Sequence, residues 1–137
     1  MIYLLDLNYT LVSNSDIKIQ PFTAQIAHEQ YRLDLIEKVE TGHVILITAR
    51  PELHRQRTLA RIKAVTAWEP DEAYFNDKRL PPPAIKSHVL NHYILSKHGT
   101  DPKQYLAIES NPRTRTMYEN YGIKAVTYEQ FINEKES

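Results

Sequence analysis

The chain has 137 residues, which is the size of one domain. Its 17 basic residues balance its 17 acidic residues, so a net charge of zero gives no global attraction to nucleic acid or to an anionic membrane. It has no cysteine, which excludes disulfides and thiolate metal sites, so any metal ion must bind oxygen or imidazole ligands.

The first residues, 1–5, are apolar, but the run is short, lacks a basic lead-in and ends at Asp6, so no secretory signal is expected. No stretch approaches the ~20 apolar residues of a membrane span. We therefore expect a cytoplasmic protein with no membrane partner, organised as one domain over 1–137, with only residues 133–137 fraying.

Five short apolar runs predict the strands of a sheet. Residues 2–5 and 44–47 suit strands that are buried on both faces, and the second is rich in β-branched side chains. Weaker or shorter strands are predicted at 73–75, 105–108 and 123–126.

Helical periodicity fills the intervals between these runs. One helix is predicted over 21–40, with an apolar face made of Phe22, Ile26, Leu33, Ile36 and Val39. A second is predicted to begin at Pro51, with Leu53, Leu59 and Ile62 facing the sheet. Further helices are predicted at 85–97, 112–121 and 128–133.

Strands that alternate with helices predict an α/β fold, with a mainly parallel five-stranded sheet in a three-layer, Rossmann-like domain. In such sheets ligands bind beyond the carboxyl ends of the strands. This rule alone selects Asp6, Thr48 and Glu109, because each follows a predicted strand.

These strand ends carry residues suited to phosphate chemistry. Asp6 could attack phosphorus and also ligate a metal ion, and Thr10 could tie down the loop that follows it. The sequence Thr48-Ala49-Arg50 could cradle a phosphate before a helix N-terminus, with Arg50 clamping its oxygens. Each segment is also compatible with an ordinary turn or cap.

Two later segments complete the set. Lys86 is placed near a helix start, where a cation is unfavourable for the helix dipole, and this mildly favours a role in neutralising phosphate over that of a surface lysine. Glu109 and Ser110 bring oxygen ligands beside Asp6, although Asn111-Pro112 also fits a capping turn.

The four segments occur in a fixed order along the chain: Asp after the first strand, Thr after the second, Lys at a later helix, and an acidic turn near the end. In that order the chain resembles the haloacid-dehalogenase superfamily of phosphotransferases over residues 2–126. The resemblance implies Asp6 as nucleophile, Thr48 as a hydrogen-bond donor to the phosphoryl group and Lys86 as its countercharge. It also implies a Mg²⁺ ion held by Asp6, the main-chain carbonyl of Asn8 and Glu109, a flap over 11–20 and no large cap domain.

Two positions depart from the superfamily pattern. Asn8 stands where the usual second Asp donates and accepts a proton, and an amide cannot exchange a proton at ordinary pH. Ser110, a neutral and weak ligand, stands in the acidic turn, where a second carboxylate is usual. Water, His43 or Glu109 could replace the missing proton donor. The chain is therefore either a phosphatase or phosphotransferase acting on a phosphomonoester, or an impaired protein that binds phosphate or a nucleotide.

Other charged and aromatic residues bear on partners. A basic helix (Arg50, His54, Arg55, Arg57, Arg61 and Lys63) could steer a nucleotide or a nucleic-acid end toward Asp6, although a solvated helix face explains it more simply. Arg113 and Arg115 open another helix at the rim of the expected site, and together with Arg50 they could contact further phosphates. The six histidines include a pair four residues apart, His88 and His92, without an acidic partner at zinc-site spacing, so structural zinc is not expected. A phosphorylated substrate or ligand is the expected partner, and a homo-oligomer is left open.

Overall fold

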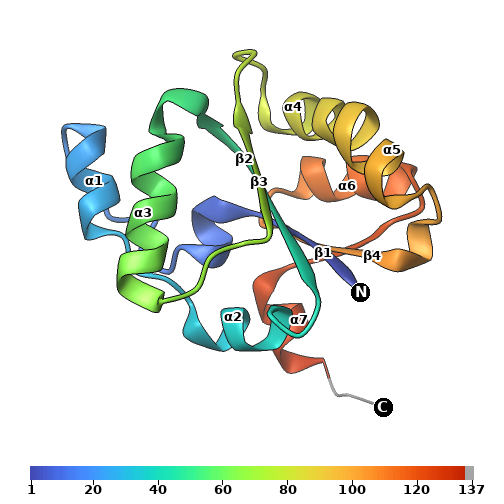
Figure 1. The fold of residues 1–137 in the computed structure, drawn as a ribbon, viewed down its shortest axis with the longest axis horizontal. Helices are drawn as coiled ribbons and strands as arrows, with labels where there is room; N and C mark the ends of the chain where they lie inside the picture. The colour runs from blue at the N-terminus through green and yellow to red at the C-terminus, as the bar shows by residue number, and fades with distance from the viewer. Residues whose placement is uncertain (135–137) are drawn as a thin grey trace.

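A computed structural model describes residues 1–134 as a three-layer α/β structure around a parallel five-stranded sheet. The strand order is β3-β2-β1-β4-β5, so the chain reverses direction across the sheet after β3. The strands are β1 (Ile2–Leu5), β2 (His43–Pro51), β3 (Glu72–Asn76), β4 (Tyr105–Ile108) and β5 (Lys124–Val126). The predicted fold class is confirmed (Figure 1).

The central strands are buried because their side chains are apolar on both faces. In β1, Leu4 and Leu5 are almost inaccessible, and they pair with Ile45 and Leu46 on one side and with Ala107 and Ile108 on the other. All five strands were predicted from sequence, and β1 and β4 have the predicted bounds.

Helices cover both faces of the sheet. One core cluster joins the sheet to α2 (Leu33–Val39), α3 (Arg55–Thr66) and α7 (Tyr128–Asn133), with α1 (Phe22–His28) beside α3. The other joins it to α4 (Pro82–Val89), a π-helical turn (Leu90–Ile94), α5 (Leu95–His98) and α6 (Pro112–Asn120). Figure 1 shows α1 and α3 on one side of the sheet and α4, α5 and α6 on the other. No helix within 1–134 is long and apolar enough to cross a membrane.

The single helix predicted over 21–40 is wrong, because the segment forms two helices, α1 and α2. Residues 29–32 are extended between them, and Tyr31 there forms an antiparallel bridge with Val12. Glu29 is drawn into the interior by a buried ion pair with Arg50. Leu33, expected on the apolar face, is exposed as a result of this break.

The helix predicted to begin at Pro51 also starts later. Strand β2 continues through Pro51, a 3₁₀ turn covers Glu52–His54, and α3 begins at Arg55. This shift leaves Leu53 mostly exposed instead of facing the sheet, while Ile62 is buried as predicted.

The helix predicted over 85–97 is longer in the structure. Helical turns run without interruption from Pro82 to His98, and α7 matches its predicted range. Of the tail expected to fray, residues 135–137 lie outside the described residues.

The segment predicted as a flap, residues 11–20, is tied to the body near its start. Ser13 N–H donates to the carbonyl of Gln30, and the buried Ser15 accepts a hydrogen bond from Tyr9 N–H at 2.8 Å. Its movement over a ligand stays a prediction, as does the absence of a cap domain.

Candidate active site

The predicted strand-end residues meet at the carboxyl edge of the sheet. Asp6 follows β1, Thr48 lies in the second half of β2, Glu109 follows β4, and Lys86 reaches them from α4. They border a cavity of about 680 Å³. Its lining residues are Asp6, Asn8, Tyr9, Thr48, Ala49, Pro82, Lys86, Glu109, Ser110, Asn111 and Pro112.

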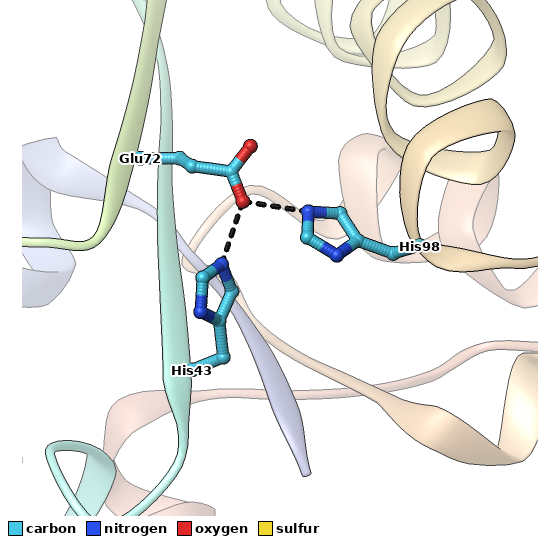
Figure 2. Close-up of side chains that lie close together, drawn as sticks. All are labelled: His43, Glu72 and His98. Atoms are coloured by element: carbon cyan, nitrogen blue, oxygen red, sulfur yellow. Dashed lines mark hydrogen bonds and ion pairs between the residues drawn. The ribbon is translucent and has the colours of Figure 1, made fainter.

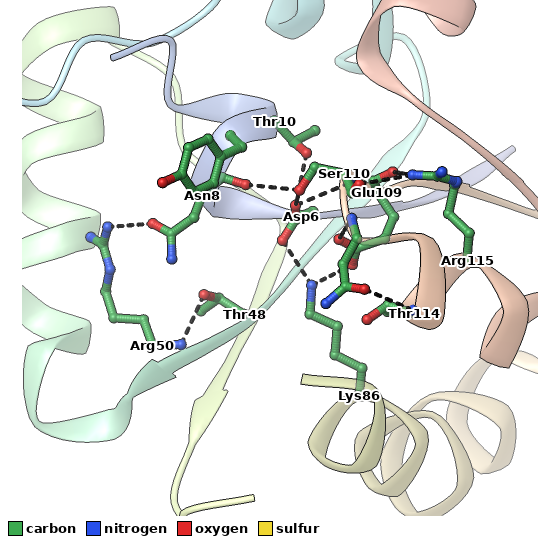
Figure 3. Close-up of polar contacts among 12 residues, drawn as sticks. Asp6, Asn8, Thr10, Thr48, Arg50, Lys86, Glu109, Ser110, Thr114 and Arg115 are labelled. Atoms are coloured by element: carbon green, nitrogen blue, oxygen red, sulfur yellow. Dashed lines mark hydrogen bonds and ion pairs between the residues drawn. The ribbon is translucent and has the colours of Figure 1, made fainter. Parts of the chain in front are cut away.

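A buried lysine bridges two carboxylates at the centre of this site. Lys86 Nζ donates to Asp6 Oδ1 at 2.8 Å and to Glu109 Oε1 at 2.5 Å (Figure 3). All three side chains are less than a tenth exposed. One ammonium therefore faces two carboxylates, which leaves a net negative charge in a poorly solvated place.

This imbalance separates the pKa values of the two acids. Burial raises the pKa of Glu109 to about 7, although the charge of Lys86 opposes the rise. Burial would also raise the pKa of Asp6, but Lys86 and the surrounding hydrogen bonds outweigh it and hold the pKa of Asp6 below its ordinary value. Burial would lower the pKa of Lys86, but the two carboxylates raise it. At neutral pH Asp6 is thus ionised, as a nucleophile must be.

A tight loop after β1, residues 7–11, fixes the other oxygen of Asp6. Thr10 Oγ1 donates to Asp6 Oδ2 at 2.7 Å, which confirms the expectation that Thr10 ties down this loop. Tyr9 takes a left-handed backbone conformation, with φ of 61°, and its half-exposed ring lines the cavity. A non-glycine residue in that region is strained, and such strain is common where a loop carries function.

Ser110 stands between the two oxygens that the resemblance assigns to a metal ion. Its Oγ lies 2.9 Å from Asp6 Oδ2 and 3.3 Å from the Asn8 carbonyl oxygen. A hydroxyl has a single proton and cannot donate to both at once. The edge of a magnesium octahedron is about 2.9 Å, given metal–oxygen distances of 2.0–2.1 Å. The spacing and the oxygen-only donors therefore fit Mg²⁺.

Glu109, the other predicted ligand, has both oxygens engaged by protein donors. Oε1 accepts from Lys86, and Oε2 accepts from Asn111 N–H at 3.1 Å. Its role as a metal ligand stays a prediction, because the contacts that the structure gives it are with Lys86 and Asn111.

The side chain of Asn8 points away from Asp6, toward a buried ion pair. Its Oδ1 accepts from Arg50 Nη2 at 2.9 Å, and the same guanidinium forms two bonds to Glu29, at 2.5 and 2.9 Å. Arg50 also donates to Thr58 Oγ1 at 3.0 Å and is only 3% exposed. Arg50 is therefore an internal brace rather than a lining residue, and the phosphate clamp predicted for it has no support in this geometry.

Thr48 and Ala49 line the cavity as predicted, but no helix follows them directly. Thr48 Oγ1 accepts from Arg50 N–H at 3.0 Å, which leaves its own proton free to donate. The expected helix N-terminus is displaced to Arg55, because β2 extends to Pro51 with an irregular register against β3.

The turn after β4 is held by the side chains of Arg115 and Asn111. Arg115 Nη1 donates to the carbonyls of Glu109 at 3.0 Å and Ser110 at 2.8 Å. Asn111 caps α6 by accepting from Arg113 N–H, which confirms the capping interpretation. The side chain of Arg113 is exposed and does not line the cavity.

Two residues that the sequence did not single out prove important, and one candidate is misplaced. Glu29 and Thr58 complete the environment of Arg50, but neither lies at a spacing that would have suggested it. His43, considered as a substitute base, pairs with Ile2 at the start of β1, so it lies at the opposite edge of the sheet from Asp6.

The fold recurs in solved structures of very different sequence. A chain in the structure of the Pnkp1/Rnl/Hen1 RNA repair complex matches 92% of this chain with a TM-score of 0.72 and 13% identity. A chain in a second structure of the Pnkp1/Rnl/Hen1 complex matches 92% with a TM-score of 0.71 and 15% identity. The match spans 41% and 45% of those chains, less than half of their length. No protein-family model and no curated protein matches the sequence. At such identities the likeness establishes the fold, with its parallel sheet and flanking helix layers.

Proposed function

We propose that the protein is a Mg²⁺-dependent phosphatase or phosphotransferase of the haloacid-dehalogenase type, acting on a phosphomonoester through Asp6. One observation carries the proposal: an ionised, buried Asp6, paired with Lys86 at 2.8 Å, borders a cavity at the carboxyl edge of a parallel sheet. Thr48 offers a free hydroxyl proton in the same cavity. An ionised carboxylate is a nucleophile, and a nearby ammonium offsets the charge of a phosphoryl group.

The chain's own groups divide the chemistry into two steps. A carboxylate oxygen of Asp6 attacks phosphorus, a P–O bond to the leaving group breaks, and an aspartyl-phosphate forms. Water then attacks phosphorus, the bond to Asp6 breaks, and inorganic phosphate leaves while the carboxylate is restored. In a transferase an acceptor hydroxyl takes the place of that water.

Lys86 and Thr48 act on charge in both steps, Lys86 through its ammonium and Thr48 by hydrogen-bonding to the phosphoryl oxygens. Asp6 Oδ2, the Asn8 carbonyl and Ser110 Oγ would hold Mg²⁺, with Glu109 as a further candidate ligand. The ion would supply additional positive charge next to the transferred phosphoryl group.

The substrate that we propose to test first is the terminal phosphate of an RNA or DNA strand. One of the two similar structures is named as that of the Pnkp1/Rnl/Hen1 RNA repair complex, and the other as that of the Pnkp1/Rnl/Hen1 complex. The lining of the cavity of about 680 Å³ includes the solvent-exposed Tyr9, whose ring could stack on a base.

A second candidate function, phosphate or nucleotide binding without turnover, rests on Asn8. Its side chain has no proton to give to a leaving group and is committed to Arg50. Loss of a general acid–base typically costs ~10²–10⁴ in rate. A substrate with a good leaving group would escape most of this cost, whereas an alkyl ester would not.

Phosphate release with and without Mg²⁺ tests both candidates. The panel should run from an activated aryl phosphate through nucleotides to RNA and DNA strands with 3′- or 5′-phosphates. Wild type should release phosphate only with Mg²⁺, and Asp6→Asn should abolish release. Asp77→Asn, at an exposed position after β3, serves as the matched control and should retain activity.

The two candidates give different results. Release that survives in Asp6→Asn would refute Asp6 as nucleophile. No release from any substrate, combined with a melting temperature of wild type that rises with phosphate or a nucleotide, would favour the binding protein.

A further inference from the structure

Two histidines and a glutamate converge at the amino edge of the sheet, on the opposite side of the molecule from Asp6. His43 opens β2, Glu72 opens the neighbouring β3, and His98 ends α5 (Figure 2). Within residues 1–134 they form a group whose candidate ligand atoms all lie within 4.8 Å of one another. The proposed phosphatase chemistry uses none of them.

Both imidazoles aim the same ring nitrogen at the same carboxylate oxygen. Nε2 of His43 and Nε2 of His98 each lie 2.6 Å from Glu72 Oε2. In a neutral imidazole the nitrogen that lacks a proton carries its lone pair in the direction of the N–H bond of the other tautomer. A geometry that directs two N–H groups to one point therefore directs two lone pairs there equally well.

Neighbouring side chains orient Glu72 and His43 in the way that outer contacts orient metal ligands. Glu72 Oε1 accepts from Lys97 Nζ at 3.0 Å and from the Tyr74 hydroxyl at 3.3 Å, which leaves Oε2 to the histidines. Nδ1 of His43 lies 3.8 Å from Asp71 Oδ2, a carboxylate that also accepts from a β2 amide. A carboxylate beside the second nitrogen of a ligating histidine is the common outer arrangement in metal sites.

The backbone around His98 is also fixed. Gln104 Nε2 donates to the carbonyl of His98 at 2.6 Å, and the Tyr105 hydroxyl donates to the carbonyl of Gly99. Gly99, with φ of 113°, ends α5 in a conformation that L side chains rarely adopt. The end of α5 is therefore tied to the start of β4, which fixes the position of His98 relative to β2 and β3, the strands that carry the other two residues.

We infer that His43, Glu72 and His98 bind a divalent first-row transition-metal ion of the zinc class. Two imidazoles and one carboxylate are a borderline donor set that zinc favours, and a water molecule can complete a tetrahedron. Ligand atoms around tetrahedral zinc are about 3.3 Å apart, so the contacts of 2.6 Å need open by only about 0.7 Å. Side-chain exposures of 39% for His43 and 17% for His98 give an ion access from solvent.

Binding of Co²⁺ and Zn²⁺ to the full chain tests the inference. Wild type should take up one equivalent of Co²⁺ with the intense visible spectrum of a tetrahedral site, and Zn²⁺ should displace it. A Zn²⁺ concentration about a hundredfold above Kd should raise the melting temperature by on the order of 10 °C. His43→Gln/His98→Gln should lose the spectrum and the melting shift, and Glu72→Gln should weaken binding by roughly tenfold or more.

The matched control is His88→Gln/His92→Gln, which removes another adjacent histidine pair. Its ring centroids are 4.0 Å apart, and neither residue belongs to the core cluster under that helical stretch. It should leave Co²⁺ binding unchanged. The inference is overturned if wild type shows neither a tetrahedral spectrum nor a melting shift in excess metal. It is also overturned if the signals persist in His43→Gln/His98→Gln while circular dichroism shows that this variant is folded.

Discussion

The buried pair between Glu29 and Arg50 makes a sharp prediction about stability. Both side chains are at most 3% exposed, and the carboxylate makes two bonds to the guanidinium. Glu29→Gln places an amide N–H₂ where a carboxylate oxygen now accepts and leaves a buried cation without its counterion. Breaking a buried pair in this way costs ~3–5 kcal/mol. A domain of this size is stable by roughly 5–15 kcal/mol, so the variant should be close to unfolding.

Urea denaturation followed by the fluorescence of Trp68, the single tryptophan, which packs against the core, measures this loss. With a slope of about 2 kcal/mol per molar, the midpoint should fall by about 2 M. Glu37→Gln, at an exposed position of α2, is the matched control and should change stability by less than ~0.5 kcal/mol.

Removing both charges separates the pair from the site that it occupies. Glu29→Leu/Arg50→Met should regain most of the stability that Glu29→Gln loses, because no charge then remains buried. If Glu29→Gln and Glu37→Gln were equally stable, the cation would be solvated in some other way, and the bracing role given to Arg50 would be refuted.

Three further substitutions probe the site itself. Because the pKa of Glu109 is raised from 4.5 to about 7, its contribution to stability is full below pH 4.5 and is lost as pH rises through 7. The urea midpoint of Glu109→Gln should therefore depend less on pH across that window than the midpoint of wild type. Ser110→Asp adds a carboxylate 2.9 Å from Asp6 Oδ2, so melting should show a loss of about 1–2 kcal/mol in a chelator and a larger Mg²⁺-dependent gain than in wild type. Asn8→Asp should raise phosphate release from an alkyl phosphomonoester by less than the full ~10²–10⁴ of a general acid, because Arg50 at 2.9 Å would hold the new carboxylate ionised.

Much of the fold follows from local signals in the sequence. The apolar runs at 2–5 and 105–108 are buried on both faces, and both formed strands with the predicted ends. The strand-end rule brought Asp6, Thr48 and Glu109 together, because the carboxyl ends of parallel strands share one edge. These predictions depend on periodicity and on topology, both of which are visible along the chain.

The failures share one physical cause, which is a contact between residues far apart in the chain. The break between α1 and α2 accompanies the burial of Glu29 against Arg50, 21 residues later, and the bridge from Tyr31 to Val12. The grouping of His43, Glu72 and His98 depends on strand order and on where a helix ends. Spacing along the sequence carries no record of either contact.

The buried pair of Glu29 and Arg50 gives a structural reason for the asparagine at position 8. Glu29 already neutralises Arg50, so an acid at position 8 would bring a second negative charge to one guanidinium, whereas the amide oxygen of Asn8 accepts a hydrogen bond from Arg50 without adding charge. The buried pair of Glu29 and Arg50 thus explains why position 8 of the proposed active site holds an asparagine, which cannot donate a proton.

Because Glu29 and Asn8 contact the same guanidinium, changing both residues should have an effect that the single variants do not show. In Glu29→Gln the cation of Arg50 lacks its counterion, and Asn8→Asp would provide one from a side chain already 2.9 Å away. The double variant Glu29→Gln/Asn8→Asp should therefore be more stable than Glu29→Gln alone, and the double-mutant cycle should give an interaction energy of about 1–3 kcal/mol. Urea midpoints of the four proteins measure it. Additive effects would mean that positions 8 and 29 act on Arg50 independently, and the residue at position 8 would then need a different explanation.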